Sequence, residues 1–64
     1  MSDRLERFER LLADTKRQYE ETAARMDALK AADKTRTATY RQLMGRKLTL
    51  AQMLESFRVY GLLE

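Results

Sequence analysis

The chain contains no cysteine, histidine, proline or tryptophan, and it has only two glycines among 64 residues. Without cysteine it has no disulfide framework, thiol nucleophile or thiolate metal site. Without histidine it lacks the commonest metal ligand and general base. A glycine-rich phosphate loop is excluded as well, because Gly45 and Gly61 stand far apart. The sequence therefore predicts a protein that is not an enzyme and holds no metal or cofactor.

Long hydrophobic runs are also missing, since no uninterrupted apolar stretch exceeds three residues. Acidic and basic residues alternate through the first fifteen positions, a pattern unlike a secretory signal or a membrane span. We therefore expect a cytoplasmic protein without membrane association. At this length the chain is one domain at most, and a domain of about 60 residues buries only about 60% of its unfolded surface. We expect a single small helical domain over residues 1–64.

The N-terminal half has the pattern of one long amphipathic helix, over about residues 3–32. It contains no glycine and consists mostly of good helix formers. One set of positions recurs at alternating steps of three and four, as in a coiled-coil seam. The positions of this seam are Leu5, Phe8, Leu12, Thr15, Tyr19, Thr22, Met26 and Leu29. The two threonines weaken the middle of the seam, which is otherwise apolar.

A turn is expected at residues 32–35, with Asp33 or Thr35 as the cap of the next helix. The rest of the chain allows two interpretations. In the first, one continuous helix forms a hairpin with the N-terminal helix. Its seam then places Lys47 in the buried stripe, and an interior glycine costs about 1 kcal/mol relative to alanine. The positions of that seam are Tyr40, Leu43, Lys47, Leu50, Leu54 and Phe57.

The second interpretation divides this half into helices over 36–44 and 50–60, which gives a three-helix unit. Gly45 would then be the left-handed residue after a helix end, and Thr49 and Gln52 have the spacing of a capping box. Gly61 would end the last helix in the same way. We favour this break because two local signals agree and Lys47 escapes burial. It predicts that Gly45→Ala destabilises the fold, because alanine is strained at a positive φ.

The fold class predicted is thus all-α, a helical hairpin or three-helix unit that assembles into a bundle. Thirty helical residues form a rod of about 45 Å, whereas a helix of 9–11 residues spans only about 14–17 Å. A short helix cannot cover the apolar strip of that rod, so we expect a homo-oligomer, with a two-fold dimer favoured. The predicted interface residues, which the core of the chain and the dimer contact would share, are Leu5, Phe8, Leu12, Tyr19, Met26 and Leu29. The alternative is a stable monomer in which Tyr19 and the two threonines are half exposed.

The net charge of +3 comes entirely from residues 33–64, which hold six basic and three acidic residues. We expect a non-enzymatic interaction or scaffold module, with a further protein partner possible at the long helix or the C-terminal tail. The alternative is a small nucleic-acid-binding regulator that uses the basic 34–47 segment in a helix-turn-helix-like arrangement. Its candidate contacts to an anion or a nucleic acid are Arg36, Arg41, Arg46 and Lys47.

Overall fold

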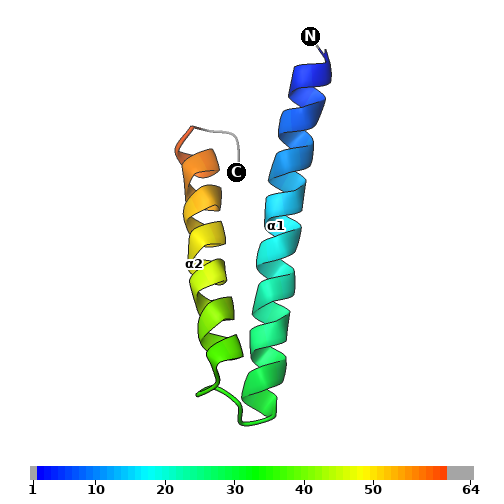
Figure 1. Ribbon diagram of the computed structural model, residues 1–64. Coiled ribbons are helices and arrows are strands. Elements are labelled where there is room, and N and C mark those ends of the chain that lie inside the picture. Colours follow the sequence, from blue (N-terminus) through cyan, green and yellow to red (C-terminus); the bar gives the residue numbers. More distant parts are fainter. Residues whose placement is uncertain (1, 61–64) are drawn as a thin grey trace.

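The structure, a computed structural model, describes residues 2–60 and consists of two helices. Helix α1 spans Ser2–Ala31 and helix α2 spans Ala38–Val59. They run antiparallel, side by side, and α1 extends beyond the C-terminal end of α2 (Figure 1). The result is an elongated rod of 48 × 19 × 18 Å. The all-α class is confirmed, and the form adopted is the helical hairpin.

Helix α1 ends in a Schellman motif. Asp33 adopts a left-handed conformation with φ 58°. Its N–H donates to the carbonyl of Lys30 at 3.0 Å, and the N–H of Lys34 donates to the carbonyl of Leu29 at 2.8 Å. These two bonds satisfy carbonyls that the last helical turn leaves without a partner. The predicted turn is confirmed, but Asp33 closes the first helix and does not cap the second.

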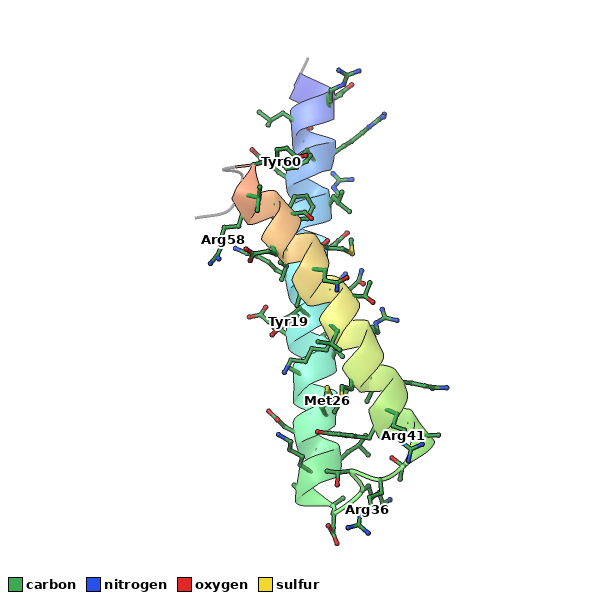
Figure 2. The ribbon with its side chains drawn as sticks, turned by 90° about the vertical axis from the view of Figure 1, so that its left-hand side faces the viewer. Tyr19, Met26, Arg36, Arg41, Arg58 and Tyr60 are labelled. Atoms are coloured by element: carbon green, nitrogen blue, oxygen red, sulfur yellow. The ribbon has the colours of Figure 1, made fainter. Side chains whose placement is uncertain are left out.

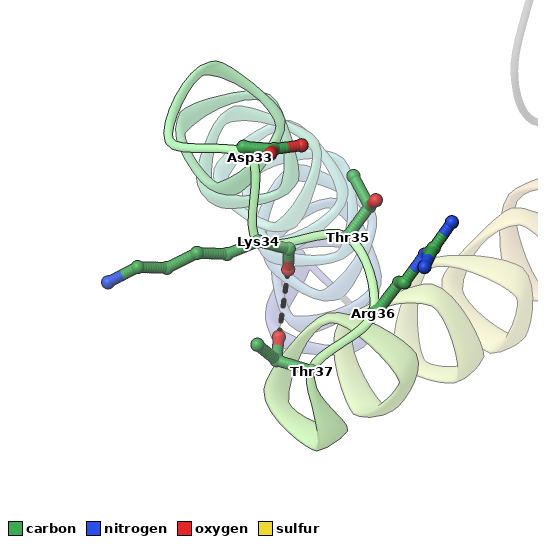
Figure 3. Close-up of a pocket in the computed structure, with 5 residues that line it drawn as sticks. All are labelled: Asp33, Lys34, Thr35, Arg36 and Thr37. Carbon is green, nitrogen blue, oxygen red and sulfur yellow. Dashed lines mark hydrogen bonds between the residues drawn. The ribbon is translucent and has the colours of Figure 1, made fainter.

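Helix α2 begins at a cap two residues later than predicted. The N-cap is Thr37, whose hydroxyl accepts a hydrogen bond from the Tyr40 N–H at 3.2 Å. The same hydroxyl donates to the carbonyl of Lys34 at 2.9 Å (Figure 3). Thr37 therefore ties the connection to the start of α2, and the helix expected from residue 36 starts at Ala38.

The predicted break at Gly45 is wrong. Helix α2 continues through this position, and a Cβ added there would meet nothing within 4 Å. Thr49 caps no helix, because its hydroxyl donates to the Gly45 carbonyl one turn back, at 3.1 Å. The suggested role of Gly61 lies outside the described residues. Burial of the α2 seam against α1 outweighs the modest cost of an interior glycine.

The core is a single line of side chains between the two helices. Met26, Tyr40 and Leu43 form a buried cluster with Leu29 packed against it, and Leu50 is buried farther along. The α2 seam is therefore the one that belongs to the continuous-helix interpretation.

Two other features complete this line. Toward the open end of the hairpin, the rings of Phe8 and Phe57 meet edge to face, with centroids 5.4 Å apart. Thr15 and Thr22 are as buried as any apolar core residue. Their hydroxyls donate to the carbonyls of Leu11 and Gln18 at 2.7 Å, so neither buried oxygen lacks a partner.

Candidate interaction surface

Most of the apolar strip predicted as an oligomer interface packs within the chain. Met26 is buried, and Phe8, Leu12, Tyr19 and Leu29 are half-buried. Of the six predicted interface residues, Leu5 alone is largely exposed, at 60%. The physical reason is the continuity of α2. A 22-residue helix is about 33 Å long, twice the length expected of a broken one, and it covers most of the strip. The part of the sequence argument that relied on a short covering helix therefore does not hold, and a role of these residues in a dimer contact stays a prediction.

The predicted basic segment does not form one patch. Arg36 lies in the connection and Arg41 at the adjoining end of α2 (Figure 2). At 100° per residue, Arg41, Arg46 and Lys47 point in three directions around α2. Arg46 donates to Gln18 Oε1 at 3.4 Å, and Lys47 Nζ lies 5.6 Å from the centroid of the Tyr19 ring.

The predicted helix-turn-helix arrangement is also absent, because residues 38–59 are one helix. A shallow hollow does exist at the connection, lined by residues 33–37. Figure 3 shows the side chains of Lys34 and Arg36 pointing away from each other there. Binding to nucleic acid stays a prediction, and no specific arrangement of the described residues favours it.

Sequence reasoning missed the side of α2 that faces away from the core. Five large apolar residues remain exposed on this helix and at its C-cap. Their exposed fractions run from 39% to 79%, far above those of the core residues. They are Met44, Leu48, Met53, Val59 and Tyr60.

Part of this surface forms a second regular row. Its spacing of three and four residues places it on one flank of α2, beside the core seam. Leu48 stands at its centre and is 61% exposed. A break at Gly45 would have separated the row, so the three-helix interpretation hid a signal present in the sequence. We call this row the α2 stripe, and its residues are Arg41, Met44, Leu48, Ala51 and Glu55.

The two helices also differ in charge. Helix α1 carries 14 charged residues among 30, and α2 carries five among 22. The outer side of α2 therefore presents mostly apolar and small polar groups to solvent, and Figure 2 views the hairpin from this side. This composition is typical of a helix that has packing partners on two sides.

Within residues 2–60, no three acidic, histidine or cysteine side chains gather where they could hold a metal ion. Neither of the two described helices has a stretch long and apolar enough to cross a membrane. No protein-family model matches the chain, and searches of curated proteins and of solved structures find no match either. The exposed side of α2 is the candidate functional surface, because five large apolar residues of this helix and its C-cap remain exposed.

Proposed function

We propose that this protein is a non-catalytic helical interaction module whose hairpins associate with one another through the exposed side of α2. One observation carries the proposal: the isolated hairpin leaves too much surface open. Its accessible surface is 5452 Å², whereas a compact monomer of 7.6 kDa exposes about 4300 Å².

The excess follows from the elongated shape of the hairpin, and it is larger than what one partner buries in a standard interface. It amounts to about 1100 Å², and a standard specific interface buries about 800 Å² on each partner. Met44 and Leu48 lie together on one flank of α2, and exposed apolar surface of this kind is typical of protein interaction sites. A second hairpin packed against α2 would also give this helix the second packing partner that its composition favours.

The direct test is the mass of the protein in solution. Sedimentation equilibrium of the full chain should detect a species of twice 7.6 kDa whose population grows with concentration. A mass that stays at 7.6 kDa up to millimolar concentration contradicts the proposal.

Matched variants locate the contact. Leu48 and Leu5 are equally exposed, at 61% and 60%, so neither substitution by glutamate should unfold the monomer. Leu48→Glu should abolish association, because it places two carboxylates in an apolar contact. Ala24→Glu, on the exposed outer side of α1, adds the same charge and should leave association unchanged. Loss of association from Leu5→Glu alone would return the contact to α1 and contradict the assignment to α2.

A further inference from the structure

The α2 stripe is complementary to itself in one orientation. Leu48 stands at its centre, and Arg41 and Glu55 lie seven residues before and after it, about 10.5 Å away along the helix axis. Resting on the self-association proposed above, we propose that two hairpins pair through antiparallel α2 helices around a two-fold axis beside Leu48. Arg41 of each copy then meets Glu55 of the other.

The steric pattern around Leu48 fits this register. With Leu48 on the axis, Met44 of one copy lies beside Ala51 of the other, and Gly45 lies beside Gln52. Gly45 has open space where a side chain would stand, since an added Cβ would meet nothing within 4 Å. The small residues Gly45 and Ala51 therefore leave room for the longer side chains of Gln52 and Met44 of the other copy, so the helices can approach closely around Leu48.

The electrostatics also favour the antiparallel orientation. Arg41 stands in the first turn of α2, which has no acidic residue, and a cation there opposes the dipole of its own helix. An antiparallel neighbour brings its C-terminal half beside Arg41, where a cation is favourable. Glu55 is exposed and carries an ion pair with Arg58 at 3.2 Å, so its carboxylate faces solvent and can accept a second cation. A parallel pair in register would set Arg41 against Arg41 and Glu55 against Glu55.

Charge reversal tests the register. Arg41→Glu creates two like-charge contacts per dimer, and Glu55→Arg does the same, so each should raise the dissociation constant about tenfold. The double variant restores both pairs with their signs exchanged and should return the constant to near that of the wild type. An equal mixture of the two single variants should form a heterodimer, because every contact between them is attractive.

Matched controls are available on α1. Arg10→Glu and Glu6→Arg change the net charge equally at exposed positions, and they should leave the dissociation constant unchanged. Circular dichroism of each variant would check that the monomer stays folded, since Glu55→Arg also removes the exposed pair with Arg58.

Disulfide trapping gives an independent readout, because the chain has no cysteine of its own. Leu48→Cys should cross-link into a dimer under mild oxidation. Val59→Cys should not, because in this register the two cysteines are about 33 Å apart along the helix axis, far beyond disulfide reach. A parallel dimer would instead trap at both positions.

The outcomes separate the two proposals. A wild-type protein that stays monomeric removes the self-association itself. If the wild-type protein dimerises but neither single charge reversal weakens the dimer, the self-association stands and the antiparallel register is overturned. Cross-linking of the Val59→Cys variant would have the same consequence.

Discussion

The two helices of the hairpin differ in the kinds of residue that they expose on their outer sides. Helix α1 has one apolar seam, and outside it charged residues predominate, with acidic and basic residues in equal number and Leu11 as the one large apolar side chain exposed off the seam. Helix α2 has a seam that faces α1 and further apolar residues that face solvent, with few charges between them. The comparison shows that α1 is suited to one neighbour and α2 to two. The self-association proposed above therefore uses α2.

The largest expected effect is a loss of folding stability when a buried residue is truncated, compared with the same change at an exposed residue. Leu50 is 5% exposed and Leu5 is 60% exposed. Leu50→Ala should lower the free energy of unfolding by about 2–4 kcal/mol, because it leaves a cavity in a core that is one side chain wide. Leu5→Ala should change it by less than about 0.5 kcal/mol.

Urea unfolding followed by circular dichroism, at one low protein concentration, measures both values. Since a domain of this size has about 3–5 kcal/mol of stability in total, Leu50→Ala should keep only about 1 kcal/mol and unfold at a much lower urea concentration. Equal effects of the two substitutions would mean that the seam between the helices is not the core.

A second, smaller effect concerns the interior of each helix. Gly45→Ala should raise the free energy of unfolding by about 1 kcal/mol, because the position is helical and open. This reverses the expectation from the sequence. Ala24→Gly, at an exposed position inside α1, is the matched opposite change and should lower it by about as much. If thermal or urea unfolding shows that Gly45→Ala is destabilising, the result would support the interpretation with a helix break at Gly45.

The smallest expected effect lies in the seam of α1. Thr15 is 2% exposed, and its hydroxyl only adds a second hydrogen bond to a carbonyl already engaged in the helix. Thr15→Val keeps the shape, leaves no polar group without a partner and adds apolar contact. It should raise the free energy of unfolding by about 0.5 kcal/mol. Thr15→Ser retains the hydroxyl without the methyl group and should lower it, so the pair of variants distinguishes packing from hydrogen bonding.

Much of the candidate surface could have been read from the sequence, yet it was not. The positions of Met44, Leu48 and Ala51 follow a three-four spacing that is visible without a structure. Local signals at Gly45 and Thr49 favoured a break, and that break divided the row. The prediction of a single basic patch failed for a different reason. Proximity in sequence does not place Arg41, Arg46 and Lys47 on the same side of a helix.

The sequence by itself determined the helical class, the extent of α1 to within a residue at each end, and the seam that packs against α2. These features follow from local propensity and from a periodicity that repeats every turn. Only the tertiary structure decided that α2 passes through Gly45, that Lys47 rests on Tyr19, and that the second apolar row faces outward. The reason is that the residues before and after Gly45 pack against α1, as Lys47 does against Tyr19, and these contacts exist only after the chain has folded back.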